Sequence, residues 1–183
     1  EKQAQAERIK QFMNYQLTDL MPEYFDEMER MLFHLPLIGS AFKKTYFDKS
    51  LNRSVSEFVP IDQFYVSYYA TDLRRASRYT HLIYKSPVEM QNDIAAGMYS
   101  DVGLPKATRP DPTALSQKLD SIMGLSPSSQ NDPQYVLLEQ HRYLQLPDKF
   151  SGGVGLLLPY IVTIEEKTKK VTKIKLLPDL MIR

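Results

Sequence analysis

Two glutamates on one expected helix are the residues of this sequence best suited to chemistry. Glu23 and Glu27 lie four positions apart in MPEYFDEMERMLFHLPLIGSAFKKTYFD, a spacing that brings both carboxylates to one helical face. Such a pair could present oxygens to a metal ion, but helical di-metal sites add Glu-x-x-His pairs, and the sequence has none. Asp26 and Arg30 show the spacing of a surface ion pair. We therefore interpret the cluster as a solvated helix face, with a metal or acid/base site as the alternative.

Three histidines are the next candidates for metal binding. They are scattered over three expected elements, as His34, His81 and His141. They could converge on zinc, yet no two of them show the short spacing of known metal motifs. His34 also closes an expected helix, where a cation is electrostatically favourable. We interpret all three as structural.

The sequence motifs give weaker support for anion binding and for nucleophilic catalysis. The stretch SGGVGLLLPY lacks the Gly-Lys-Ser/Thr ending of a phosphate loop, and apolar residues follow Gly153 and Gly155 where a dinucleotide fingerprint needs its third glycine. Basic residues gather in RRASR (74–78) and KTKK (167–170), and together with the 12 tyrosines they leave single-stranded nucleic acid as an alternative to simple solvation. There is no Gly-x-Ser-x-Gly elbow. The sequence predicts no catalytic residue, cofactor or metal ligand.

Composition limits the classes of protein further. The 183 residues are 43% hydrophobic and 25% charged, which is enough for one sizeable domain or for a core with an appendage. A net charge of +1 predicts no global attraction to nucleic acid or to an anionic membrane. The absence of cysteine excludes disulfides and thiolate catalysis. With no long apolar run, we expect a soluble, cytosolic protein without a membrane partner, and a piece of a longer chain because it begins without methionine.

Apolar periodicity predicts two helices at the start. The first carries Ile9, Phe12, Met13, Leu17 and Leu20 on one face. Pro22 disfavours helical geometry at the residue before it, so a second or kinked helix is expected to begin there. Pro36 and Gly39 are expected to end it. Its expected buried stripe consists of Tyr24, Met28, Met31, Leu32 and Leu35.

Alternating patterns predict strands in the rest of the chain. A hairpin is expected from 42–47 and 54–59, then a strand in PIDQFYVSYY, a helical turn in ATDLRRAS and strands at 79–85, 135–146, 159–166 and 171–177. Ser86, Pro87 and Glu89 form a capping box that predicts a helix ending near Gly97. Residues 103–133 hold five of the 12 prolines and are predicted to form a mobile excursion, with one short helix starting at Asp111-Pro112.

These elements predict an α+β fold in which N-terminal amphipathic helices pack on antiparallel strands and hairpins. The predicted organisation is a helical and mixed segment at 1–102, the Pro/Ser-rich excursion at 103–133, and antiparallel strands at 134–183 that complete the same domain.

Seven segments follow one another in a recognisable order. They are MNYQLT, MPEYFDEMERMLFHLPLIGSAFKKTYFD, FVPIDQFYVSYYATDL, RYTHLIY, GMYSDVGLP, YVLLEQHRYLQL and PYIVTIEE. In this order the sequence resembles the portal proteins of tailed bacteriophages and their prophages, from about Met13 to about Ile174. The block 22–48 with the proline-aspartate-aromatic stretch after it is the most specific part, and no single motif is catalytic.

That resemblance implies a structural, non-enzymatic role. Portal proteins form a dodecameric ring at one capsid vertex of the virion, through which DNA is packaged and later ejected. Assembly takes place in the host cytoplasm, and the ring contacts the capsid, the terminase and later the tail or adaptor proteins. The family's long stem helices and channel-lining segments have no counterpart here. We therefore expect the outer, wing-like part of the subunit, without direct DNA contact. A phage adaptor or neck-type binding module without a ring, and a hydrolase with an unrecognised site, are the alternatives.

Overall fold

The chain folds into two compact units in the computed structural model, which describes residues 2–48, 51–73, 75–124, 132–147 and 157–177. Unit 1 comprises Glu1–Ile61 and unit 2 comprises Asp62–Arg183. This boundary falls inside the segment 1–102 that the sequence predicts to be continuous. The physical reason is strand pairing, because the strands on the two sides of the boundary belong to different sheets.

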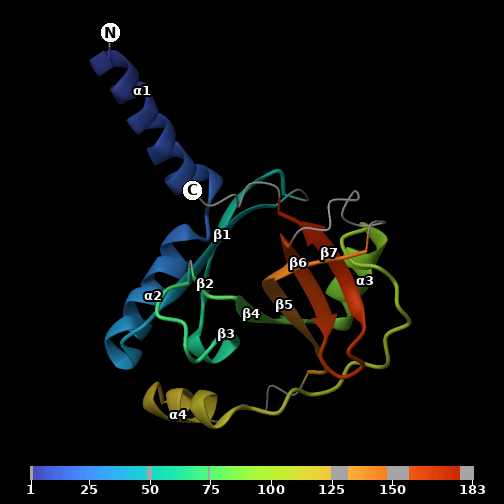
Figure 1. The fold of residues 1–183 in the computed structure, drawn as a ribbon. Helices are drawn as coiled ribbons and strands as arrows, with labels where there is room; N and C mark the ends of the chain where they lie inside the picture. Colours follow the sequence, from blue (N-terminus) through green and yellow to red (C-terminus); the bar gives the residue numbers. More distant parts are fainter. Residues whose placement is uncertain (1, 49–50, 74, 125–131, 148–156, 178–183) are drawn as a thin grey trace. The chain divides into compact units, whose positions relative to one another are not determined.

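Unit 1 begins with two helices separated at a proline (Figure 1). Helix α1 (Lys2–Tyr15) continues into a π-helical turn, η1 (Gln16–Leu20), and helix α2 (Tyr24–Ile38) follows. Met21, between them, is buried and lies outside the helical region with φ −119° and ψ 74°. Because Pro22 disfavours helical geometry at Met21, the predicted restart at this position is confirmed.

The end of α2 differs from the sequence prediction in one respect. Pro36 lies inside the helix, which ends at Gly39 with φ 81° and a hydrogen bond from its N–H to the Leu35 carbonyl. Pro36 removes only one backbone hydrogen bond, close to the C-terminus, so the helix continues through it for two more residues. Gly39 supplies the left-handed conformation that ends many helices, as predicted.

The predicted hairpin of unit 1 is confirmed. Strand β1 (Phe42–Asp48) pairs antiparallel with β2 (Arg53–Val59), in a register that runs from Phe42 opposite Val59 to Asp48 opposite Arg53. The two form a separate two-stranded sheet, and helix α2 packs against β2. The buried residues of this hairpin all come from β2, namely Val55, Ser56, Phe58 and Val59.

Unit 2 is built on an antiparallel sheet of five strands in chain order (Figure 1). After the 3₁₀ turn η2 (Ile61–Gln63), the strands are β3 (Phe64–Val66), β4 (Arg78–Lys85), β5 (Tyr135–Leu144), β6 (Leu158–Glu165) and β7 (Val171–Leu176). All neighbours pair antiparallel, which confirms the predicted α+β class. The core of the sheet is most tightly closed at Leu137 and Thr163, both 0% exposed.

Two short helices accompany the sheet. Helix α3 (Pro87–Ala95) has the predicted capping box, because the Ser86 hydroxyl accepts the Glu89 N–H and the Glu89 carboxylate accepts the Ser86 N–H. Its Met90 is 1% exposed. Helix α4 (Ala114–Ile122) lies within the predicted excursion and begins two residues later than expected, because the Thr113 hydroxyl accepts the Ser116 N–H. The segment ATDLRRAS forms turns without a helix in its described residues.

Candidate functional site

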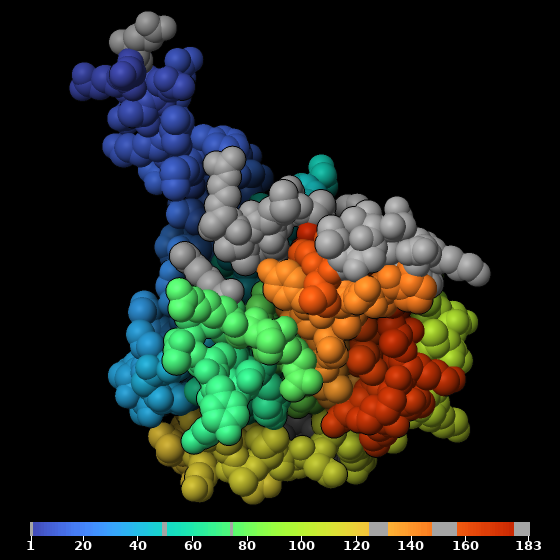
Figure 2. All heavy atoms as spheres, viewed as in Figure 1, coloured from blue at the N-terminus to red at the C-terminus, as the bar shows by residue number. Residues whose placement is uncertain are grey.

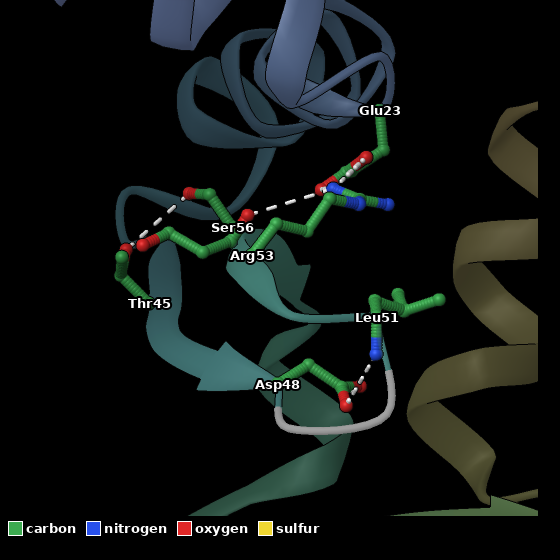
Figure 3. A network of polar contacts seen from close by, with 7 residues as sticks. Glu23, Thr45, Asp48, Leu51, Arg53 and Ser56 are labelled. Atoms are coloured by element: carbon green, nitrogen blue, oxygen red, sulfur yellow. Dashed lines mark hydrogen bonds and ion pairs between the residues drawn. The ribbon is translucent and has the colours of Figure 1, made fainter.

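The acidic cluster of α2 faces the hairpin, and its first member forms an ion pair there. Arg53, at the start of β2, donates from Nη1 to both Glu23 oxygens, at 2.6 and 2.9 Å (Figure 3). Both side chains are three-quarters covered, at 25% and 24% exposure. The hydrogen bond from Arg53 lowers the pKa of the Glu23 carboxyl below its ordinary value of 4.5, although burial acts in the opposite direction. Glu23 therefore anchors the start of the helix to the hairpin.

Glu27 is the second anchor, and it contacts backbone. One carboxylate oxygen accepts the Phe58 N–H at 2.6 Å, and the other accepts Arg30 Nη1 at 2.9 Å. The predicted solvated face is therefore wrong for Glu23 and Glu27, and Arg30 pairs with Glu27 instead of Asp26. The reason is that β2 presents an outward N–H at Phe58 where α2 crosses it, and a carboxylate is a strong acceptor for such a donor. Nothing in the sequence marks Phe58 as a donor to a helix.

A lysine lies next to these carboxylates. The Lys43 ammonium, on β1, sits 3.8 Å from the centre of the Tyr24 ring, in cation–π geometry. Its Nζ is buried and has no hydrogen-bond partner in the part of the chain that the structure describes. Burial lowers the pKa of Lys43, and the nearby Glu27 charge partly offsets that effect. Tyr24 and Glu27 of α2 and Lys43 of β1 thus form one compact group between the helix and the hairpin.

His34 completes the contact between α2 and β2. Its ring lies 4.9 Å from the Phe58 ring, and Nδ1 is 2.7 Å from the Arg30 carbonyl. Across the described ranges, no group of three or more His, Cys, Asp or Glu residues could hold a metal ion. Because Glu23 and Glu27 accept hydrogen bonds from Arg53, Phe58 and Arg30, this arrangement fixes the helix on the hairpin.

The apolar stripe expected to be buried in α2 is largely exposed. Leu32 and Leu35 are 56% and 41% exposed, and Met28 and Met31 are only half-buried. The prediction fails because α2 is apolar on more than one side and the anchoring carboxylates determine which side faces β2. What remains outside is a surface that we call the outer apolar face, formed by Phe25, Leu32, Phe33 and Leu37. On α1, the predicted stripe residues Ile9, Phe12 and Met13 are exposed as well.

The other two histidines belong to unit 2 and lie on neighbouring strands. His81 is buried at 9% exposure and pairs in register with Glu139. His141 stacks on Tyr79 with ring centres 4.7 Å apart, and its Nε2 lies 3.2 Å from a Glu139 oxygen. Burial raises the pKa of Tyr79, and the Glu139 charge acts in the same direction. These groups form a polar cluster within the sheet.

The lysines of the β6–β7 turn bind the chain of the predicted excursion. Lys170 donates to the carbonyls of Val102 and Gly103, at 2.7 and 3.1 Å, and Lys167 contacts the Thr108 hydroxyl. Solvation alone is thus the wrong interpretation for these two lysines, because backbone carbonyls and a hydroxyl come within their reach. Of the remaining candidates, Arg74, Gly153 and Gly155 lie outside the described residues.

The same turn is fixed by a buried carboxylate. Glu165 is 2% exposed and accepts hydrogen bonds from the Lys167 N–H, the Thr168 N–H and the Thr168 hydroxyl. Burial raises its pKa, but these hydrogen bonds outweigh burial and hold the pKa below 4.5. The sequence pattern singles out only the lysines of this stretch and not Glu165.

Comparisons with known proteins add no assignment. No model of a known protein family matches the chain, and a search of curated proteins found no relative. Within the described ranges, every helix is too short or too polar for a membrane span.

Proposed function

We propose that this chain is a structural, non-enzymatic part of a phage portal protein. In this proposal it contributes to the ring through which DNA is packaged into the capsid and later ejected. The ordered resemblance between Met13 and Ile174 supports the family, and the surface of unit 1 supports the ring.

The observation that carries the proposal is the outer apolar face of α2. Phe25, Leu32, Phe33 and Leu37 are between 47% and 59% exposed, and Asp26, Glu29 and Arg30 on the same helix are exposed too. Grouped exposed apolar side chains mark protein-interaction surfaces. The helical spacing places Glu29 between Phe25 and Phe33, so this surface mixes apolar and charged groups. In a ring, each subunit repeats one such contact with the next until the rotation closes.

The anchors of α2 make this face suitable for assembly. The pairs Glu23–Arg53 and Glu27–Phe58 N–H fix the helix on the hairpin through polar contacts. The helix can therefore keep its position while its apolar side chains are available to a neighbouring subunit. A fixed helix also loses less conformational entropy on association than a mobile one.

The test is electron microscopy and mass measurement of the full-length product, with and without Phe33→Asp. We expect rings with a central hole from the unchanged protein and smaller species from the variant. Leu157→Asp is the matched control, because Leu157 is 65% exposed and belongs to unit 2. Circular dichroism of the 183-residue chain should show the same helix content and melting temperature for both variants.

Five results would count against the proposal. A full-length protein that stays monomeric at high concentration would remove the ring. Rings that form normally with Phe33→Asp would remove the outer apolar face from the interface. A large loss of stability in the isolated Phe33→Asp chain would mean that this face packs within the chain. A discrete complex with one partner and no ring would favour the adaptor or neck-type module, and nuclease or metal-dependent hydrolase activity would favour an enzyme.

A further inference from the structure

Strand β7 forms one edge of the five-stranded sheet, and part of that edge is open. The Leu177 N–H donates to the Pro159 carbonyl at 3.0 Å, so Leu177 faces β6. Because hydrogen-bonded and non-bonded pairs alternate along an antiparallel ladder, Lys175 and Lys173 also face β6, whereas Ile174 and Leu176 direct their backbone groups outward. At the other end of the strand, the Thr172 carbonyl accepts the Ser100 N–H at 2.8 Å.

No described residue occupies the outward N–H and C=O groups of Ile174 and Leu176. Unpaired groups on a sheet edge are a template for another strand, and proteins usually block them with bulges, prolines, charged side chains such as lysine, or covering segments. The lysines of β7, Lys173 and Lys175, disfavour a basic added strand but not an acidic one. The β-bulge of this pair lies at Thr163/Ile164, near the end of β7 already touched by Ser100. The open part of the edge, at Ile174 and Leu176, therefore lies away from the bulge.

A hollow runs beside the same edge. Its volume is about 450 Å³, and it is lined by Ser100, Tyr160, Val171, Thr172, Lys173, Ile174 and Leu176. Tyr160, from β6, is 2% exposed, and its hydroxyl has no hydrogen-bond partner among the described residues. In Figure 2, β7 lies in red on the surface of unit 2.

The two faces of β7 differ in chemistry. Ile174 and Leu176 share the face of Tyr160 and are 44% and 42% exposed. Lys173 and Lys175 lie on the opposite face, and Lys175 is exposed. Side chains of an added strand would alternate in the same way, apolar against Ile174 and Leu176 and charged beside the lysines.

We propose that β7 binds an extended segment of a partner protein as a sixth strand, and that this segment alternates apolar and acidic residues. Backbone hydrogen bonds to Ile174 and Leu176 give the segment its direction. Apolar side chains cover Ile174, Leu176 and the hollow at Tyr160, and carboxylates lie next to Lys175. This mode of recognition is β-augmentation, in which main-chain bonds supply affinity and alternate side chains supply specificity.

Charge argues against a second copy of β7 as the occupant. Two β7 strands paired edge to edge would bring their lysines together on one face, and like charges directly opposite are destabilising. An acidic segment reverses the sign of that interaction. The proposal concerns unit 2 alone and does not depend on ring formation.

The experiment uses the whole 183-residue chain and a blocked, fluorescently labelled peptide of about eight alternating Glu and Val residues, a usual strand length. Binding is followed by fluorescence anisotropy, and the contact is mapped from the backbone amide signals of ¹⁵N-labelled protein. We expect selective shifts and slower hydrogen exchange at Ile174 and Leu176. A Lys/Val peptide should bind at least about tenfold more weakly, because the interaction with Lys175 becomes repulsive.

Two changes test the backbone contact itself. Ile174→Pro removes an outward N–H without removing a bond to β6, since proline is tolerated on strand edges, and it should weaken the Glu/Val peptide about tenfold. Ile174→Val keeps the N–H and should bind like the unchanged protein. If Ile174→Pro disturbs folding, a Glu/Val peptide N-methylated at alternate residues replaces it. That peptide lacks the N–H groups that would pair with β7, so it should bind more weakly.

Charge reversal tests the acidic specificity. Lys175→Glu should lose affinity for the Glu/Val peptide and gain it for the Lys/Val peptide. Four results would overturn the proposal: no binding of the Glu/Val peptide, equal binding of its N-methylated form, shifts that avoid β7, or protection of Ile174 and Leu176 by self-association of the protein alone.

Discussion

Replacing Glu27 with alanine tests whether a carboxylate fixes α2 to the hairpin. The change removes the acceptor of the Phe58 N–H and the partner of Arg30. It also removes the negative charge that offsets the burial of the Lys43 ammonium. A solvated glutamate on a helix usually tolerates replacement by alanine, whereas an anchoring glutamate does not. Glu27→Ala therefore distinguishes the interpretation of Glu27 as solvated from its interpretation as an anchor.

The size of the effect follows from the surroundings of each contact. Phe58 is 7% exposed, and a buried N–H that loses its acceptor costs about 1–3 kcal/mol. The Arg30 side chain is 60% exposed, so its pair with Glu27 adds only about 0.2–0.5 kcal/mol. We therefore expect Glu27→Ala to lower the free energy of unfolding of unit 1 by about 2–3 kcal/mol. Asp26→Ala, on the exposed side of α2, should change it by less than about 0.5 kcal/mol.

The measurement must report on unit 1 separately, because two units need not unfold together. Hydrogen exchange of backbone amides under mild urea, read by mass spectrometry for peptides covering β1 and β2, meets this requirement. Glu27→Gln keeps an acceptor oxygen and should recover part of the loss. Equal stability of Glu27→Ala and Asp26→Ala would refute the anchoring role and restore the interpretation of Glu27 as a solvated residue.

Two further predictions concern the core and pH. Leu137 is 0% exposed, so Leu137→Ala should lower the free energy of unfolding of unit 2 by about 2–5 kcal/mol in urea. Leu157→Ala, at an exposed position, should lower it by less than about 0.5 kcal/mol. Similar losses for both variants would contradict the assigned core. Since the folded pKa of Glu23 lies below 4.5, its stabilisation is complete above pH 4.5 and is lost as the pH falls through the folded pKa. Hydrogen exchange of unit 1 against pH should show this loss, and Arg53→Met should reduce it; an unchanged profile would argue against the ion pair.

Local signals in the sequence predicted the elements of this fold well. The capping box at Ser86 and Glu89 depends on residues three positions apart, and the structure has it as predicted. The β1–β2 hairpin likewise follows from alternation and a short turn, because these patterns fix neighbours along the chain. Alternation also predicted the strands of unit 2, but not their order in the sheet, since long segments separate β4 from β5 and β5 from β6. Pro22 separates two helices because its ring disfavours helical geometry at the residue directly before it, which is a local effect.

The orientation of α2 could not be predicted in the same way. Apolar residues lie on several sides of the helix, so periodicity alone did not determine which side meets the sheet. The deciding contacts, from Glu23 to Arg53 and from Glu27 to the Phe58 N–H, join residues 30 and 31 positions apart. A backbone N–H has no sequence signal of its own. For this reason the sequence predicts solvent exposure for Glu23 and Glu27 and burial for Leu32, and the structure reverses these assignments while Asp26 stays exposed.

This reversal changes what a mutation at Leu32 should do. A buried Leu32, as the sequence predicts, would make Leu32→Asp strongly destabilising, but a side chain 56% exposed contributes little to the core. Glu23 and Glu27 fix α2 on the hairpin, whereas in the proposed ring the exposed apolar residues of α2 are available for association. In this proposal, folding and assembly are therefore supported by different residues of α2. A change on the outer apolar face should alter assembly at constant stability, and a change at Glu27 should alter stability first.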